Sequence, residues 1–292
     1  MAIPIEFSEF RDRSPSDRLV ILGAGASRDL GVPSGEEVIE LIQQRKSEMK
    51  VLASLCRRAE FEPAVAALDF LIEQGDPFTA SAVLSQFLKA YSGPLLISDI
   101  AALKNEKRAL LQLLRENMYK PRDTSPTDEE REFVDGILDL QRGSTIISLN
   151  YDNLLEWAGS DRIVPVVRDG TDRVTVPPTE PDLTRVLHLH GAITWSEYKN
   201  IVVDHHRPPH DEAAALVLGV GNKLRYYEPF LEMYQVLRDE LRRVSAILTV
   251  GFSFRDAHVV QQLTEWAERV GEQGQLHICN PVGELPDQIK DW

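Results

Sequence analysis

The sequence predicts an α/β protein with a Rossmann-like, doubly wound parallel sheet and a helical insertion. Apolar runs of strand length alternate with amphipathic helical segments toward both ends of the chain, as in a sheet with crossover helices. Residues 47–142 contain helical patterns and no convincing strand. A glycine-rich turn directly follows the first apolar run. We therefore expect a core formed by residues 1–46 and 143–292, with residues 47–142 as a helical lid or association surface.

The first elements of the core are a strand, a glycine turn and a helix. After a polar and loosely held arm up to about Asp17, the run Arg18–Leu22 predicts a buried strand. The turn Gly23-Ala-Gly-Ala-Ser27 has no bulky side chain, so we expect its backbone to approach a ligand closely. The next segment predicts a helix to about Lys46, because Val38, Ile39, Leu41 and Ile42 share one face. The first amides of that helix would favour an anion such as pyrophosphate.

The predicted insertion consists of amphipathic helices. Proline stands at or near several of their starts and glycine after several of their ends, which is typical of helix boundaries. The predicted helices are Val51–Glu60, Pro63–Gln74, Pro77–Tyr91, Leu95–Tyr119 and Thr127–Gln141.

Strand patterns return after residue 143. Apolar β-type runs are predicted at Ser144–Leu149, Ile163–Val167, Arg185–Leu189, Ala246–Val250 and Gln275–Cys279. Helices are predicted at Asp152–Trp157, Glu228–Arg243 and Asp256–Val270. The polar, histidine-rich stretch from Trp195 to about Glu212 is expected to be a long loop.

The composition limits the range of functions. The chain has 292 residues and a formal charge of −14, which disfavours sequence-independent binding to a phosphate backbone. Its two cysteines, Cys56 and Cys279, provide neither a disulfide framework nor a cysteine-rich zinc site. No apolar stretch is long enough to span a bilayer. The first residues lack a basic region followed by a long apolar run, so we expect no secretion signal. We expect a soluble, cytoplasmic protein that binds no membrane.

Unusual residues follow four of the predicted strands. Because the carboxyl ends of parallel strands meet at one edge of a sheet, these turns are expected to share one cleft. The cleft would combine two glycine turns with an asparagine, an aspartate and a histidine. The four turns are Gly23–Ser27, Asn150-Tyr-Asp-Asn153, His188-Leu-His190-Gly191 and Gly251-Phe-Ser-Phe-Arg-Asp256.

Each turn also has a purely structural interpretation. Asp152 and Asp256 are well placed to cap the helices that follow them. His190 is also consistent with a histidine that is hydrogen-bonded in the core and has no catalytic role. The glycine turn departs from the dinucleotide fingerprint of ordinary dehydrogenases, because Arg28 stands where a third glycine is required.

A divalent metal site is a rival interpretation of the histidines. His188 and His190 lie two residues apart on a strand, and further candidate ligands follow in the polar loop. No acidic residue near the pair has a recognisable ligand spacing, which disfavours this alternative. The loop candidates are Asp204, His205, His206 and His210.

Five motifs in the same order resemble the sirtuin-like superfamily of NAD-consuming enzymes. They are Gly23–Ser27 with Gly31-Val-Pro33, Asn150-Tyr-Asp152, Leu189-His190-Gly191, Gly251-Phe-Ser253 and Cys279-Asn280-Pro281. Within the superfamily, Ser148-Leu-Asn-Tyr-Asp152 and Gly251–His258 are similar to motifs of bacterial anti-phage defence domains. Protein deacylases of the superfamily carry two cysteine pairs for a structural zinc, and this chain lacks them. No zinc is therefore expected.

The resemblance implies roles for individual residues. His190 would be the general base, and Asn150 and Asp152 would line the nicotinamide-ribose pocket. Asn280 would contact the adenosine ribose. The residues implied for the pyrophosphate and its neighbouring ribose are Gly23, Ala24, Gly25, Ala26, Ser27, Gly251 and Ser253.

The expected activity is hydrolysis of NAD to nicotinamide and ADP-ribose, in anti-phage defence through depletion of NAD. The alternatives are a non-catalytic sensor of NAD or ADP-ribose and, less favoured, an NAD-dependent deacylase. Because such an activity needs restraint, we expect a homo-oligomer or a controlling partner, such as an ATPase or Argonaute-type protein by family resemblance. Apolar faces on the insertion helices motivate this expectation.

Overall fold

A five-stranded, all-parallel sheet forms the centre of the molecule. The computed structural model describes residues 8–57, 59–87, 99–167, 171–205, 215–217 and 227–280. The strands stand in the order β3-β2-β1-β6-β7, and each pairs in parallel with its neighbour. The predicted α/β fold is confirmed. The strands are β1 (Arg18–Leu22), β2 (Thr145–Ser148), β3 (Arg185–His188), β6 (Ala246–Val250) and β7 (Gln275–Cys279).

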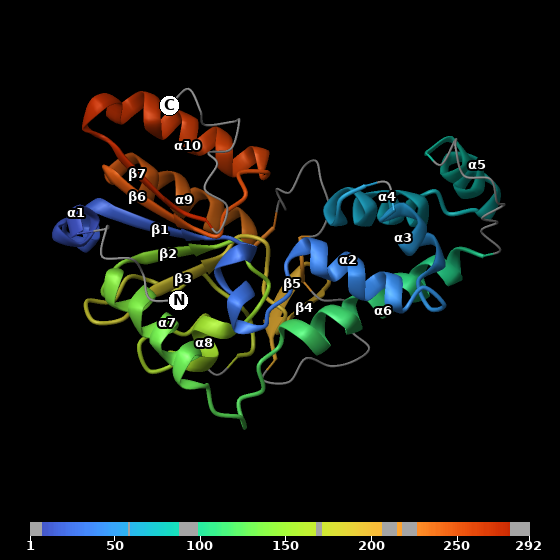
Figure 1. Ribbon diagram of the computed structural model, residues 1–292, viewed down its shortest axis with the longest axis horizontal. Coiled ribbons are helices and arrows are strands. Elements are labelled where there is room, and N and C mark those ends of the chain that lie inside the picture. The colour runs from blue at the N-terminus through green and yellow to red at the C-terminus, as the bar shows by residue number, and fades with distance from the viewer. Residues whose placement is uncertain are drawn as a thin grey trace.

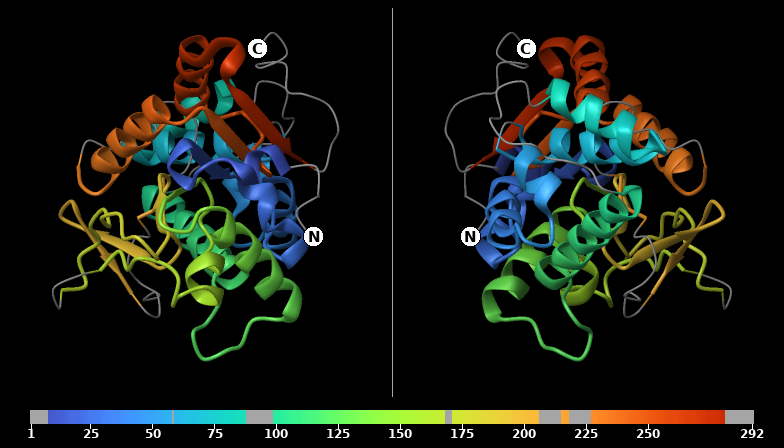
Figure 2. Two further views of the ribbon diagram at one scale, coloured as in Figure 1. Left: turned by 90° about the vertical axis from the view of Figure 1, so that its left-hand side faces the viewer. Right: turned by 90° about the vertical axis from the view of Figure 1, so that its right-hand side faces the viewer.

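Helices cover both faces of this sheet (Figure 1, Figure 2). The side chains of β1 alternate between the two layers, because successive residues of a strand point to opposite faces. Leu19 and Ile21 pack toward α9 (Phe230–Arg243) and α10 (Ala257–Val270). Val20 and Leu22 pack toward α7 (Asp128–Leu140) and α8 (Leu154–Ala158). Every residue of β1 is buried, as expected for a central strand.

A block of helices lies beyond the carboxyl ends of the strands (Figure 1). It has its own apolar core, in which Leu52, Leu68 and Leu110 are fully buried. Its helices are α2 (Gly35–Gln44), α3 (Lys50–Leu55), α4 (Phe61–Glu73), α5 (Pro77–Phe87) and α6 (Ile100–Met118).

Packing groups the helices differently from the ranges predicted for core and insertion. Val38 and Ile42 of α2 point into the core of the helical block, although α2 precedes residue 47. In contrast, Val134 and Ile137 of α7 pack on the sheet, although α7 lies inside 47–142. The apolar stripe of each helix decides which body it joins. The predicted ends of two helices, at Tyr91 and from Leu95, fall outside the described residues.

The run Ile163–Val167 does not form the predicted strand. Only single bridges connect it to its neighbours, from Ile163 to Thr184 and from Val167 to Val174. Pro165 in the middle of the run has no N–H group, so a continuous ladder of hydrogen bonds cannot form there.

The prediction of a long loop from Trp195 is wrong for its first part. β4 (Trp195–Tyr198) and β5 (Ile201–Asp204) form an antiparallel hairpin. Lys199 and Asn200 join them with φ values of 50° and 61°, as a tight hairpin turn requires. His206 and His210 lie outside the described residues.

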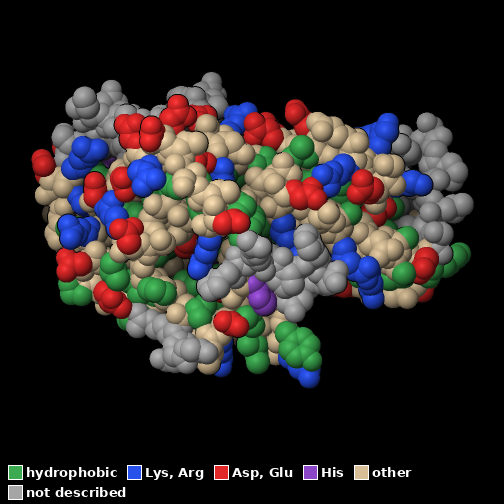
Figure 3. Space-filling model, turned by 90° about the horizontal axis from the view of Figure 1, so that it is seen from below, with side chains coloured by type: hydrophobic (Ala, Val, Ile, Leu, Met, Phe, Trp, Pro, Cys, Tyr) green, Lys and Arg blue, Asp and Glu red, His purple; other side chains and the backbone are tan. Residues whose placement is uncertain are grey.

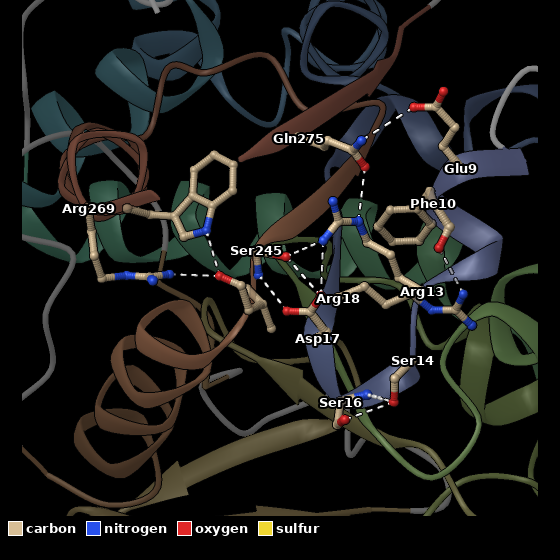
Figure 4. Close-up of polar contacts among 12 residues, drawn as sticks. Glu9, Phe10, Arg13, Ser14, Ser16, Asp17, Arg18, Ser245, Arg269 and Gln275 are labelled. Carbon is tan, nitrogen blue, oxygen red and sulfur yellow. Dashed lines mark hydrogen bonds and ion pairs between the residues drawn. The ribbon is translucent and has the colours of Figure 1, made fainter. Parts of the chain in front are cut away.

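The described part of the N-terminal arm is held firmly, contrary to the expectation of a loose segment. α1 (Ser8–Asp12) and the following 3-10 turn lie against β6 and β7 at the amino ends of the strands. Asp17 accepts hydrogen bonds from the amide and hydroxyl of Ser245, and Arg13 donates to Gln275 at 3.0 Å (Figure 4). Arg18 donates to the carbonyl of buried Phe10. None of the described helices is long and apolar enough to cross a membrane.

Candidate active site

Two glycine turns interlock at the carboxyl edge of the sheet. The Gly25 amide donates to the Gly251 carbonyl at 3.0 Å. A Cβ atom on Gly251 would lie 2.0 Å from the Ala26 nitrogen, and one on Gly23 would lie 2.5 Å from the Gly251 oxygen. The glycines therefore allow the turns after β1 and β6 to pack on each other. The sequence predicts a different reason for these glycines, namely the close approach of a ligand to the backbone.

The helix predicted to begin at the glycine turn begins later. Two 3-10 turns, Ala24–Ala26 and Arg28–Leu30, come before α2. Ser34 and Glu37 form a capping box at the start of α2. The Glu37 amide therefore already donates a hydrogen bond to the Ser34 hydroxyl. The prediction that the N-terminus of this helix adjoins the turn is therefore wrong.

Ser27, Asn150 and Asp152 form a buried polar cluster between the turns after β1 and β2. The Ser27 hydroxyl donates to a carboxyl oxygen of Asp152 at 2.8 Å, and the Asn150 amide donates to Ser27 Oγ at 3.0 Å. All three residues are less than a tenth exposed. Within the described part of the chain, Oδ1 of Asn150 has no hydrogen-bond partner. A buried acceptor without a partner is costly, so this oxygen is a candidate contact for a ligand.

Burial also changes the acidity of this cluster. It raises the pKa of Asp152, although the hydrogen bonds from Ser27 and from the Leu154 amide favour the charged carboxylate. Asn153 is the N-cap residue of α8, so the prediction that Asp152 is the N-cap is wrong. Asp152 lies one residue earlier and accepts a hydrogen bond from the amide of Leu154, the first residue of the helix.

A small cavity of about 10 Å³ lies under the cluster. Its space suits one water molecule, so a larger ligand group enters only if the lining moves. The polar residues that line it are Ser27, Ser148, Asn150, Asp152 and His188.

His190 lies at the same edge and is paired with Asp256. Its Nε2 is 2.7 Å from Oδ2 of Asp256, and its Nδ1 is 3.3 Å from the carbonyl oxygen of Leu149. Both side chains are only 4% exposed. Oδ1 of Asp256 accepts hydrogen bonds from the first amides of α10, so this residue is a helix cap as well as the partner of His190.

His188 points to different partners. Its Nε2 is 2.7 Å from Glu156 and its Nδ1 is 3.1 Å from the carbonyl oxygen of Asn150. Burial opposes the charged ring, but the Glu156 carboxylate and the Asn150 carbonyl raise the pKa of His188 to about 9. The ring is therefore a cation at neutral pH and fixes the backbone of Asn150.

The turn after β6 also contacts the residue that follows β7. The Asn280 amide donates to the Phe252 carbonyl at 3.0 Å, and its Oδ1 has no partner among the described residues. Phe252 and Phe254 are buried against each other, with ring centroids 4.5 Å apart. Ser253 between them is exposed, so its hydroxyl is accessible at this edge.

The rival metal site is not assembled in the described part of the chain. His188 and His190 bind separate carboxylates, and His205 contacts Ser196 at 2.6 Å on the hairpin. No group of three potential metal ligands gathers among the described residues. Cys56 and Cys279 lie in different apolar clusters.

Sequence reasoning missed two pairings at this edge. Asp256 was interpreted as a helix cap without its contact to His190, and Glu156 was not singled out at all. In the sheet, β1 and β2 lie between β3 and β6. The strand order therefore shows that the turns after β3 and β6, which carry His190 and Asp256, meet across the carboxyl ends of β1 and β2.

On the face seen in Figure 3, acidic and basic side chains intermix over the described residues.

Comparisons with known proteins show which families and folds the chain is similar to. Residues 144–285 match the family model described as a SIR2-like domain. No curated protein matches the chain significantly.

A solved structure of a Sir2 homologue shares the fold. A Sir2 homologue in complex with NAD has 17% identity and a TM-score of 0.51, over 95% of this chain and 82% of that one. A mutant Sir2 homologue in complex with ADP-ribose has 15% identity and a TM-score of 0.49, over 98% and 89% of the two chains. The sirtuin-like fold thus extends over nearly the whole length of the present chain.

Proposed function

We propose that this chain is an NAD⁺ glycohydrolase, which cleaves the bond between nicotinamide and ribose and releases ADP-ribose. The observation that carries the proposal is the pair of buried amide oxygens, Oδ1 of Asn150 and Oδ1 of Asn280, that have no partner among the described residues at one sheet edge. Ribose hydroxyl groups are the donors that such oxygens need. NAD contains two riboses, and the similar Sir2 homologue was solved with NAD.

The proposed binding mode follows the turns along this edge. The pyrophosphate would lie on Gly23–Ser27, where Ala24 is exposed, and beside the turn of Gly251 and exposed Ser253. The adenosine ribose would contact Asn280, and the nicotinamide ribose would contact Asn150 near Asp152. The interlocked glycine backbones hold these contacts in place before the ligand arrives.

The reaction breaks the bond from C1′ to the pyridinium nitrogen, whose electrons leave with neutral nicotinamide. A water oxygen bonds to C1′ and loses one proton, which His190 accepts. The products are nicotinamide, ADP-ribose and the proton, so atoms and charge balance. Asn150 would orient the water or a ribose hydroxyl without itself titrating, and the buried edge would exclude other water.

The test measures nicotinamide release from NAD⁺ by the purified chain. His190→Ala and Asn150→Ala are each expected to lower turnover by about 10²-fold or more while the protein remains folded. His205→Ala is the matched control, because His205 lies on the hairpin and contacts Ser196. Full turnover by both site variants would overturn the proposal. NAD binding without release by the wild type would favour the sensor instead.

We also propose a role in bacterial anti-phage defence through depletion of NAD, on the basis of the motif resemblance. Oligomers or a controlling partner protein would restrain the activity. Cells that carry the wild type are expected to lose NAD after infection, whereas cells that carry His190→Ala keep it. A fully active monomer, measured by light scattering with the activity assay, would contradict the oligomer.

A further inference from the structure

We propose that Asp256 is a positioning residue, which holds His190 so that Nδ1 is the ring atom that accepts the proton. The inference rests on the proposed function, because it concerns the base of that reaction. It assigns to Asp256 a role beyond the helix cap expected from the sequence.

The two carboxyl oxygens of Asp256 have separate partners. Oδ1 accepts from the amides of His258 and Val259, at 3.0 and 3.1 Å. Oδ2 lies 2.7 Å from Nε2 of His190. The backbone of α10 therefore fixes the carboxylate, and the carboxylate in turn fixes the imidazole ring. This linkage is preorganised, because Asp256 and His190 are both 4% exposed.

The contact determines the tautomer of the neutral ring. A carboxylate only accepts hydrogen bonds, so Nε2 of His190 must carry a hydrogen. Nδ1 then carries the lone pair and is the atom that can take a proton. Its 3.3 Å distance from the Leu149 oxygen is slightly longer than usual for an N–H···O bond.

The product of the proton transfer is stabilised by the same surroundings. When Nδ1 takes up a proton, the ring becomes an imidazolium with two N–H groups. The Leu149 carbonyl then accepts from Nδ1 and the Asp256 carboxylate accepts from Nε2. Both ring nitrogens face acceptors, so the arrangement stabilises the charge that develops on His190.

Asp256→Asn separates the two roles of this residue. The amide oxygen can still cap α10, but the amide nitrogen is a donor toward Nε2. Nε2 must then accept a hydrogen bond from this amide, so the ring hydrogen moves to Nδ1. The N–H group at Nδ1 donates a hydrogen bond to the Leu149 carbonyl. The variant is expected to lose about 10²–10⁴-fold in kcat, with KM changed by less than about threefold.

The experiment combines kinetics with ¹⁵N NMR of histidine-labelled protein, using His190→Ala to assign the signals of the ring. The wild type is expected to show hydrogen on Nε2, and Asp256→Asn to show hydrogen on Nδ1. Asp99→Asn is the matched control, because Asp99 caps α6 through the Ala101 amide. It should leave both kcat and the ring signals unchanged.

The outcomes separate this inference from the proposed function. An unchanged tautomer in Asp256→Asn, or a kcat within about twofold of an active wild type, overturns the role of Asp256 alone. If the wild type releases no nicotinamide, the proposed function fails, and the ring signals still decide whether Asp256 sets the tautomer.

Discussion

At the scale of single residues, His188 and His190 show how neighbouring histidines acquire different properties. They are separated by one residue, yet each binds its own carboxylate, from Glu156 and from Asp256. Sequence spacing identified both histidines as candidates, but it could not assign these partners. Glu156 is on α8 and Asp256 precedes α10, so only the tertiary packing brings each carboxylate to its histidine.

The pairing of His188 predicts a pH dependence of stability. Its pKa is raised from 6.5 to about 9 in the folded protein, so the native state retains a proton that the unfolded chain releases. The contribution is complete below pH 6.5, declines between pH 6.5 and 9, and is lost above about pH 9. We expect a loss on the order of 1–3 kcal/mol in the free energy of unfolding.

Urea unfolding at several pH values measures this effect. Glu156→Gln removes the carboxylate and is expected to flatten the decline between pH 6.5 and 9. Parallel stability curves for the wild type and this variant would show that His188 does not retain its proton.

The interlocked glycine turns predict a large cost for one added methyl group. Gly251→Ala places Cβ 2.0 Å from the Ala26 nitrogen and keeps a residue at φ +62°. We expect it to lower the free energy of unfolding by about 3 kcal/mol or more. Gly31→Ala is the control, because Gly31 has φ +80° but no atom within 4 Å of a new Cβ. It should cost only about 1 kcal/mol, and equal losses in urea unfolding would contradict the account.

At the scale of elements, local signals predicted the strands and helices well where nothing interrupted them. The apolar run of β1 and the apolar face of α2 specify these elements without tertiary information. The strand predicted at Ile163–Val167 does not form, because Pro165 interrupts the ladder of backbone hydrogen bonds and leaves only single bridges. The β4–β5 hairpin was missed because its turn, Lys199-Asn200, lacks the glycine that usually marks such turns.

A buried carboxylate of α6 supports the start of α3. Glu106 is 7% exposed and accepts hydrogen bonds from the amides of Val51 and Leu52. Glu106→Ala leaves these donors unpaired, so we expect a loss of about 2–3 kcal/mol in thermal or urea unfolding. Glu116→Ala on the same helix is the control, because Glu116 is half-exposed and its carboxylate interacts with the exposed side chains of Arg45 and Gln112, so the loss should be less than about 1 kcal/mol. Similar losses for both variants would refute the capping role.

At the scale of the whole molecule, the sheet and the helical block meet at the candidate site. An ion pair joins them directly, from Arg255 beside Asp256 to Glu60 at the start of α4, at 2.9 Å. The absence of strand patterns between residues 47 and 142 predicts a helical insertion in this part of the chain. The boundary between the sheet and the helical block was less predictable. The apolar faces of α2 and α7 are equally clear in the sequence, but an apolar face does not indicate whether its helix packs on the sheet or in the helical block.

The convergence of the turns was predictable for a general reason. Parallel strands place their carboxyl ends at one edge, so residues after β1, β2, β3 and β6 had to come near each other. The lack of a partner among the described residues for the oxygens of Asn150 and Asn280 was not predictable, since it depends on which hydrogen-bonding groups the fold places around each amide.

The most direct test of the account is a crystal structure of His190→Ala soaked with NAD⁺, in which slow turnover preserves the ligand. The account predicts one dinucleotide along the Gly23–Ser27 and Gly251–Ser253 turns, with ribose hydroxyls donating to Oδ1 of Asn150 and Oδ1 of Asn280. NAD bound at another place, or no density at this edge at millimolar NAD, would contradict it.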